Sequence, residues 1–301
     1  MTQVLISGGT GLVGKALCAK LQAKGYDVAI LSRSKKYNSS IKTYLWNPDE
    51  NQIDSNAITS SDYIIHLAGA NIAEKRWSSS RKQLIIDSRV GSANLIFNEV
   101  KKQNKELKAF VSASGVGYYG AITSEEIFTE ESQAADDFLG QTCLKWENSA
   151  KQFVTLNIRT TILRTGIVLN KQGGALSKMS IPIKLGLASA LGNGNQYLPW
   201  IHIDDLCEIY IKAIEDKDVS GIFNAVAPDF QTNKSFTQAL AKTLKKPYCL
   251  PNTPSFLLKL ILGEMSVIIL EGSRASSDKI IKKGFIFKFS KLGDALTDLL
   301  K

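Results

Sequence analysis

The sequence lacks the features that mark disulfide-rich, zinc-binding or secreted proteins. Its four cysteines, at positions 18, 143, 207 and 249, form no CxxC motif and no paired spacing, which is typical of reduced thiols in a cytoplasmic protein. His66 and His202 are the only histidines, so we expect no metal site. No basic segment precedes the first apolar run at Val4, so we expect no signal peptide.

Long apolar runs and extended basic–aromatic stretches are also lacking. The segment from Phe256 to Leu270 is interrupted by Lys259 and Glu264 and falls short of the roughly 20 apolar residues that span a bilayer. We expect it to form a helix buried against a second lobe or a subunit partner, with no membrane partner. The net charge of +9 lies in short groups such as Lys245-Lys246. This pattern favours scattered surface lysines and an anionic cofactor site, and we expect no nucleic-acid partner.

A glycine-rich segment near the amino terminus carries the strongest positive signal. The apolar run Val4-Leu5-Ile6-Ser7 leads into Gly8-Gly9-Thr10-Gly11-Leu12-Val13-Gly14 and then into residues at helical spacing. Strand, glycine turn and helix in this order are typical of a dinucleotide-binding loop. Gly8 permits a tight turn, Gly11 lets a pyrophosphate approach the backbone, and Gly14 lets the helix pack closely on the strand. The helix N-terminus offers N–H groups to the phosphates; an ordinary strand-to-helix turn is the alternative.

Strands and helices alternate along most of the chain. We expect strands at 26–31, 43–46, 63–67, 109–112 and 155–163, and helices at about 79–102 and 138–150. This order predicts an α/β fold with a Rossmann-type doubly wound parallel sheet. The NAD(P)-binding Rossmann domain is expected at 1–165, with strands near 200–204 and 222–226 returning to it. A smaller, mostly helical substrate lobe is expected at 166–301, with 250–298 as a C-terminal helical domain.

The end of the second strand indicates the cofactor. Ser32-Arg33 stands there, Lys35-Lys36 follows, and no carboxylate lies between Val28 and Thr43. In NAD-specific folds an acidic residue about 20 residues past the glycine loop holds the adenosine ribose. An arginine can instead stack on adenine and donate two hydrogen bonds to a 2′-phosphate. We therefore expect NADP(H) to be preferred over NAD(H); a surface arginine after a strand is the alternative.

Motifs spread over nearly the whole chain resemble the extended short-chain dehydrogenase/reductase superfamily. Within it the chain is similar to the atypical, NAD-dependent epimerase-like group with a C-terminal helical domain. The matching stretches are GGTGLVG (8–14), HLAGANIAEKRW (66–77), DSR (87–89), SGVGYYG (114–120), LRTGIVL (163–169), WIHIDDL (200–206), NAVAP (224–228) and LEGSRASSDKIIKKGFIF (270–287). The resemblance implies nicotinamide hydride transfer on a small polar or nucleotide-linked substrate. We expect a monomer or homodimer.

One departure from the superfamily concerns its Tyr-xxx-Lys pair. If Glu147 marks the glutamate that often follows this pair, the tyrosine position is Leu139 and the lysine position is Cys143. The neighbouring register gives Phe138 and Thr142, which supply neither an acid nor a charge. The usual general acid and ribose-binding lysine are therefore missing from this helix.

Other residues are candidates for the chemistry. The tentative catalytic residues are Ser114, Tyr118 and Tyr119, although a strand-end serine and pocket-lining aromatic rings are the alternatives. Arg89 or Arg164 is a candidate cation near the phenols, and Arg89 can partly replace the missing lysine. The expected cofactor-binding residues are Gly8, Thr10, Gly11, Leu12, Val13, Gly14, Ser32, Arg33, Leu67, Ala68, Gly69, Arg89, Ser112, Ala113, Arg164, Gly166 and Val168.

Three further features receive mainly structural interpretations. We expect His202 to be a satisfied structural histidine and Asp204-Asp205 to cap a helix. Arg76-Trp77 lies either at a substrate pocket or on a surface loop. Two functions stay open at this point: an NADP(H)-binding oxidoreductase or epimerase, and a catalytically silent NADP(H)-binding regulatory protein.

Overall fold

A computed structural model describes residues 2–34 and 41–301. Its centre is an eight-stranded sheet in the order β11-β8-β6-β5-β1-β2-β3-β4, parallel throughout except for the β3–β4 pair. Its strands are β1 (Gln3–Ser7), β2 (Asp27–Ser32), β3 (Lys42–Asn47), β4 (Gln52–Ile53), β5 (Tyr63–His66), β6 (Ala109–Gly115), β8 (Thr160–Thr165) and β11 (Gly221–Ala225). Two-stranded sheets are formed by β9 (Ile167–Asn170) with β10 (Trp200–His202) and by β7 (Ile127–Phe128) with β12 (Arg274–Ala275).

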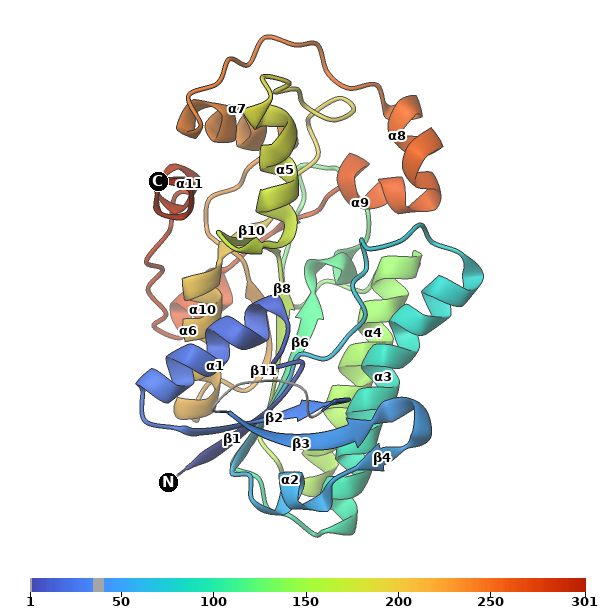
Figure 1. The fold of residues 1–301 in the computed structure, drawn as a ribbon, viewed down its shortest axis with the longest axis vertical. Coiled ribbons are helices and arrows are strands. Elements are labelled where there is room, and N and C mark those ends of the chain that lie inside the picture. The colour runs from blue at the N-terminus through green and yellow to red at the C-terminus, as the bar shows by residue number, and fades with distance from the viewer. Residues whose placement is uncertain (1, 35–40) are drawn as a thin grey trace.

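Helices cover both faces of the sheet and build an upper lobe above it (Figure 1). The α-helices are α1 (Leu12–Ala23), α2 (Ser55–Thr59), α3 (Ser79–Lys102), α4 (Phe138–Lys151), α5 (Gly174–Lys184), α6 (Ile203–Glu215), α7 (Asn233–Thr243), α8 (Ser255–Leu262), α9 (Val267–Leu270), α10 (Asp278–Lys282) and α11 (Leu292–Leu300). Short 3₁₀ turns are η1 (Pro48–Glu50), η2 (Val116–Tyr119), η3 (Gln152–Leu156) and η4 (Gly263–Ser266).

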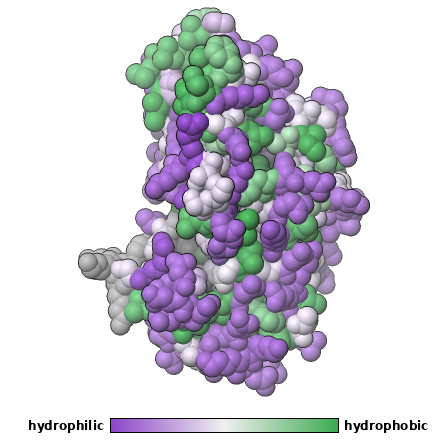
Figure 2. Space-filling view, turned by 90° about the vertical axis from the view of Figure 1, so that its right-hand side faces the viewer, coloured by the Kyte–Doolittle hydropathy of each residue, from purple (hydrophilic) through white to green (hydrophobic). Residues whose placement is uncertain are grey.

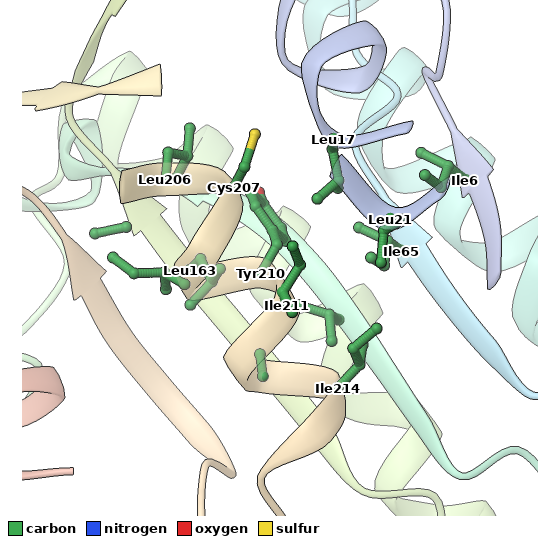
Figure 3. Packing of buried hydrophobic residues seen from close by; sticks show 14 of the residues in the cluster. Ile6, Leu17, Leu21, Ile65, Leu163, Leu206, Cys207, Tyr210, Ile211 and Ile214 are labelled. Carbon is green, nitrogen blue, oxygen red and sulfur yellow. The ribbon is translucent and has the colours of Figure 1, made fainter. Parts of the chain in front are cut away.

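The two faces of the central sheet bury separate apolar layers. On one face α1 and α6 pack together, and Leu17 of α1 and Tyr210 of α6 lie in the same cluster as Ile6 and Leu163 of the sheet (Figure 3). On the other face α3 and α4 cover a cluster that includes Phe110. Because both faces are covered, the central strands β1, β5, β6 and β8 are almost wholly buried, as expected for parallel sheets. The doubly wound Rossmann-type sheet is therefore confirmed.

The upper lobe has an apolar core of its own. Trp200, Phe236 and Leu296 are buried there together, contributed by β10, α7 and α11. This lobe lies above the carboxyl ends of β6 and β8 (Figure 1), where ligands of doubly wound sheets bind. The mostly helical C-terminal lobe is also confirmed.

Several boundaries differ from those expected. The strand expected at 155–163 begins only at Thr160, because 152–156 forms the 3₁₀ turn η3. The strand at 221–225 joins the central sheet beside β8, but the strand at 200–202 pairs with β9 outside it. Ile280 and Phe285 pack into the cluster under α1 and α6. The chain after residue 165 thus contributes to both lobes.

The segment from Phe256 to Leu270 was expected to form a buried helix, and the expectation of burial against the second lobe of the same chain is wrong. No residue of α8 is buried, and Leu260 is 73% exposed. The segment also breaks into α8, η4 and α9, because Gly263 has a φ of +61° and ends the first helix. In the described residues no helix is long and apolar enough to cross a membrane.

The WIHIDDL motif ties the C-terminal segment to α6. His202, and not Asp204 or Asp205, is the N-cap: its Nδ1 accepts a hydrogen bond from the Asp204 backbone N–H at 3.1 Å. Asp205 instead accepts the backbone N–H groups of Lys288 and Phe289 at 2.8 and 2.9 Å. His202 thus has a structural role as the cap, but it is only partly satisfied, because its buried Nε2 has no hydrogen-bond partner in the described residues. The interpretation of Asp204-Asp205 as the cap is wrong.

Candidate active site

The glycine loop has the shape that a close ligand approach requires. Gly8 has a φ of +75°, a conformation that favours glycine. A Cβ on Gly14 would lie 2.3 Å from the Gly8 carbonyl oxygen, so α1 packs against the turn only because residue 14 has no side chain. A Cβ on Gly9 would lie 2.3 Å from Ile30, a constraint that the motif alone did not reveal.

The first turn of α1 is free to receive an anion. Its N-cap is Gly11, no side chain caps the helix, and the first turn contains no acidic residue. Gly11 and Thr10 are exposed, and Leu12 and Val13 are partly exposed. A helix N-terminus with open N–H groups and no competing carboxylate attracts phosphate.

Ser32 and Arg33 lie at the carboxyl end of β2, at the same edge of the sheet as the glycine loop that follows β1. Ser32 Oγ donates to the Ser34 carbonyl at 3.0 Å and accepts the Ser34 N–H at 3.3 Å, so it forms a compact local turn. Arg33 is exposed. Lys35-Lys36 lies outside the described residues. The predicted adenosine end of the site is thus exposed, and within residues 2–34 and 41–301 Arg33 forms no ion pair.

Arg89 approaches the loop that follows β5. Its Nη1 donates to the carbonyls of Ala70 and Ile85 at 3.1 and 2.9 Å. A Cβ on Gly69 would lie 3.1 Å from the Arg89 guanidinium carbon. This carbon also lies 5.0 Å from the centre of the Trp146 ring. Burial lowers the pKa of Arg89, but an arginine side chain stays charged in proteins. The loop after β5, with Leu67, Ala68 and Gly69, therefore has a fixed cation beneath it.

A buried ion pair lies under the end of β6. Arg164 of β8 binds Glu147 of α4 with two parallel hydrogen bonds, Nε to Oε1 at 2.8 Å and Nη2 to Oε2 at 2.9 Å. Arg164 is 1% exposed, as is Glu147. Burial alone lowers the pKa of Arg164, but its bonds to Glu147 outweigh this effect and raise it. Ser114 Oγ donates to Glu147 Oε1 at 2.8 Å.

The tyrosines of η2 extend this network. Arg164 Nη1 donates to Tyr119 Oη at 3.1 Å, and Tyr119 donates to Asn224 Oδ1 at 2.6 Å. Burial raises the pKa of Tyr119 to about 12, despite the nearby Arg164. The guanidinium carbon of Arg164 also lies 3.4 Å from the centre of the Tyr118 ring. Tyr119 is 1% exposed and Tyr118 is 8% exposed, so the two rings form, with Arg164 and Glu147, a buried wall beneath the end of β6.

The register proposed for α4 places apolar side chains where the superfamily has its Tyr-xxx-Lys pair. A Cβ on Gly117 would lie 3.4 Å from Leu139 Cβ and 3.8 Å from Cys143 Sγ. Burial raises the pKa of the Cys143 thiol to about 11, so it is a neutral thiol at physiological pH. The two positions therefore face the η2 turn without an acid or a cation.

Several predicted cofactor contacts lie deep in the wall. Ser112 is fully buried and its hydroxyl donates to the Ala113 carbonyl at 3.0 Å. Arg164 has its donors directed to Glu147, Tyr119 and the Glu130 carbonyl. Contacts of these two side chains with a ligand would require the wall to open. Ala113, Gly166 and Val168 are partly exposed at the same edge.

Sequence analysis missed the residues that hold this wall together. Glu147 served only as a register marker, although it joins Ser114 to Arg164. Asn224 donates its side-chain N–H to the Ser276 carbonyl at 2.9 Å and its backbone N–H to Glu130 at 2.7 Å. The NAVAP motif was the available signal for Asn224, and nothing in the sequence pointed to Glu130.

The loop containing Arg76-Trp77 lies against the segment that follows α8. A Cβ on Gly263 would lie 2.9 Å from Arg76 Nη2, and Lys82 forms an ion pair with Glu264. Trp77 packs edge-on against Phe138 with ring centres 4.8 Å apart. The contacts of Arg76 and Lys82 thus join the two lobes.

A surface groove of about 510 Å³ lies elsewhere, on the outer faces of α3 and α4. This groove is not lined by the glycine loop, Arg33, Ser114 or the tyrosines of η2. We therefore assign the candidate site from the positions of those residues. Among the described residues no cluster of three or more His, Cys, Asp or Glu side chains could hold a metal ion.

Comparison with known proteins agrees over the whole chain. Residues 4–225 match the family model described as the NAD dependent epimerase/dehydratase family, and 253–299 match a domain of unknown function, DUF1731. An epimerase family protein of Staphylococcus aureus is 35% identical over 301 residues, covering 100% of both chains. The epimerase family protein YfhF of Bacillus subtilis is 35% identical, covering 99% of this chain and 97% of its own.

A solved structure is similar over the same length. The human epimerase family protein SDR39U1 (isoform 2), solved with NADPH, has a TM-score of 0.89 and 32% identity, covering 99% of each chain. The fold, the sequence motifs and the similar proteins all indicate the same family for both lobes. The chain therefore belongs to the NAD-dependent epimerase/dehydratase family, as an extended short-chain dehydrogenase/reductase with a C-terminal DUF1731 domain.

Proposed function

We propose that the chain is an NADP(H)-dependent oxidoreductase or epimerase that acts on a small polar or nucleotide-linked substrate. The observation that carries this proposal is the glycine turn, where the backbone packs too closely at Gly8 and Gly14 for any Cβ and α1 begins without a side-chain cap. The NADPH complex of the similar human protein supports the same cofactor class. We place the protein in the cytoplasm, as a monomer or homodimer.

The exposed residues of the site fit a dinucleotide laid along the sheet edge. The first turn of α1, with Gly11, Leu12 and Val13, would hold the pyrophosphate. Ser32 and Arg33 would hold the adenosine end. Arg89 stands beside Cys143, where the superfamily keeps its lysine, and would supply the missing positive charge near the ribose. A bound nicotinamide would supply hydride transfer, and Ser114 at the carboxyl end of β6 is the candidate hydroxyl for the reacting oxygen.

The preference for NADP(H) gives a direct test. The Arg33→Asp variant should lose most of the difference in affinity between NADPH and NADH, because a 2′-phosphate would then face a carboxylate. One charged hydrogen bond contributes about 1.5–3 kcal/mol, which is on the order of tenfold to a hundredfold in the dissociation constant. Fluorescence titration of wild type and variant with both reduced cofactors measures it.

The matched control is Lys101→Asp, the same charge change at an exposed lysine near the end of α3. It should leave both dissociation constants unchanged. Equal affinities of the wild type for NADPH and NADH would refute the preference, and failure of both to bind would refute the proposed function.

A catalytically silent NADP(H)-binding regulatory protein is the second candidate. The observation that favours it is the pair Leu139 and Cys143, which face η2 without an acid or a cation. Slow NADPH oxidation with a panel of carbonyl compounds would favour the enzyme. Tight NADPH binding with no turnover, together with a protein partner, would favour the regulator.

The role of Cys143 can be tested under either function. Because its thiol is buried and neutral, Cys143→Ser should leave the NADPH dissociation constant within about threefold, or about 0.7 kcal/mol. Where turnover is found, the loss should stay below about a hundredfold, the lower range for general acid–base catalysis. A larger loss in a variant with an unchanged melting temperature would show that Cys143 takes part in the reaction.

A further inference from the structure

The upper lobe carries an unbalanced positive charge. Residues 171–200 and 230–263 contain eight lysines and no aspartate or glutamate, in a chain with a net charge of +9. All eight are exposed, and within the described ranges none of them forms an ion pair. They are Lys171, Lys178, Lys184, Lys234, Lys242, Lys245, Lys246 and Lys259. The charge is therefore a property of this lobe and is not spread over the molecule.

The same two segments expose large apolar side chains, which we call the apical patch. Phe256, Leu260 and Ile261 of α8 are 66, 73 and 64% exposed, and Leu185 after α5 is 72% exposed. The full patch is Ile181, Leu185, Leu187, Leu250, Phe256, Leu257, Leu260 and Ile261. Apolar surface gathers at the top of the molecule over the region of α8 (Figure 2).

Hydrogen bonds join the two halves of the patch. The Thr253 backbone N–H donates to the Ala190 carbonyl at 2.8 Å, and Ser189 Oγ donates to the Pro251 carbonyl at 2.7 Å. The segment after α5 and the segment before α8 are thus fixed side by side. Lys184 adjoins Leu185, and Lys259 lies within α8 itself, so cations accompany the apolar side chains at both ends of the patch.

Charge selects among the possible occupants of this surface. In a twofold dimer the same patch would face itself, and Lys184 and Lys259 would meet lysines, because the two segments contain no carboxylate. A nucleic acid would pair with the lysines but leave side chains such as Leu260 without an apolar partner. A bilayer surface with anionic headgroups satisfies both, since lysines bind the headgroups while apolar side chains enter the acyl boundary.

We propose that the apical patch docks the protein reversibly on membrane surfaces that contain anionic phospholipids. Such docking needs no membrane-spanning helix. It departs from the expectation of no membrane partner in the sequence analysis, which was based only on the lack of a spanning segment. The apolar helix is short, at eight residues. Attachment should therefore be weak without the lysines and should fall as salt screens them. The proposal does not depend on the proposed cofactor or reaction.

Flotation of the full chain with lipid vesicles tests this. The wild type should float at low salt with vesicles of phosphatidylcholine containing one-third phosphatidylglycerol, and much less with pure phosphatidylcholine or at high salt. Each lysine near the surface contributes about 1 kcal/mol, roughly fivefold in the partition constant. The double variant Lys184→Glu, Lys259→Glu should therefore bind at least about 20-fold more weakly. The double variant Leu260→Ser, Ile261→Ser should bind at least about tenfold more weakly.

Matched controls lie at the other end of the molecule or on another surface. Lys101→Glu with Lys217→Glu makes the same charge change at two exposed lysines, and Ile286→Ser removes an isoleucine that is 88% exposed. Both should float like the wild type, with unchanged melting temperatures in all variants. Failure of the wild type to float, or equal loss in the controls, overturns the proposal. A wild-type dimer that Leu260→Ser with Ile261→Ser dissociates, or duplex DNA binding unaffected by that variant, also overturns it.

Discussion

Replacing Glu147 with alanine is expected to lower the free energy of unfolding by about 3–5 kcal/mol, the cost of leaving a buried charge without its partner. Arg164 is 1% exposed and its two strongest hydrogen bonds go to Glu147. In the variant the guanidinium stays charged, because arginine is not deprotonated in proteins. Ser114 loses its acceptor as well. Thermal unfolding should show a melting temperature lower by roughly 10 °C.

Two comparisons separate this effect from the loss of any carboxylate. Glu208→Ala breaks the contact with Lys20 at 3.0 Å, where both side chains are partly exposed, and should cost no more than about 1 kcal/mol. The double variant Glu147→Leu, Arg164→Met removes both charges and should recover most of the loss. If Glu147→Ala and Glu208→Ala were equally stable, or if the double variant were the least stable, the buried pair would not have the role assigned to it.

The glycine loop was predictable because its constraints are local. Gly8 and Gly14 lie within one turn, and their roles follow from the backbone conformation and from the short distance between α1 and β1. The alternation of strands and helices likewise fixed the central sheet, because parallel strands need covered faces. Sequence spacing is sufficient to predict a structural feature when the interactions that produce it join residues a few positions apart.

The buried wall beneath the end of β6 was not predictable, because its contacts join residues that lie far apart in the sequence. Glu147 and Arg164 meet because α4 crosses the end of β8, and Asn224 reaches Tyr119 from a strand 105 residues away. Polar side chains that pair across a fold leave no periodic signal in the sequence. Arg164 therefore read as a cofactor contact at the end of a strand, whereas its partner is another side chain.

The exposure of the segment from Phe256 to Leu262 within the chain could not be predicted, because composition does not determine burial; burial against a subunit partner stays a prediction. Apolar content favours a buried helix, yet Gly263 ends α8 early and turns the chain toward Arg76. The part before the turn remains exposed, whereas Met265 after it is buried. One residue with a positive φ thus separates an exposed helix from a 3₁₀ turn with buried residues.

Acidification is expected to destabilise the protein between about pH 6.5 and pH 4 through His66. Burial lowers the pKa of His66 from 6.5 to about 4 in the folded state, while an unfolded histidine keeps a pKa of about 6.5. In this window the unfolded chain binds more protons than the folded one, so the free energy of unfolding falls as the pH falls. The full effect is about 3 kcal/mol, at about 1.4 kcal/mol for each pH unit of the difference.

The geometry explains why His66 resists protonation, and it supplies the test. Its Nδ1 shares a hydrogen bond with Ser7 Oγ at 2.7 Å, and its Nε2 faces the Arg89 carbonyl at 3.4 Å, with no carboxylate contact among its hydrogen bonds. His66→Gln keeps polar atoms there but cannot titrate, so urea unfolding should show a flatter dependence on pH between 4 and 6.5. Burial also lowers the pKa of His202, so His202→Gln should remove a separate part of the slope. A His66→Gln protein with the wild-type slope would mean that His66 is not protonated on unfolding.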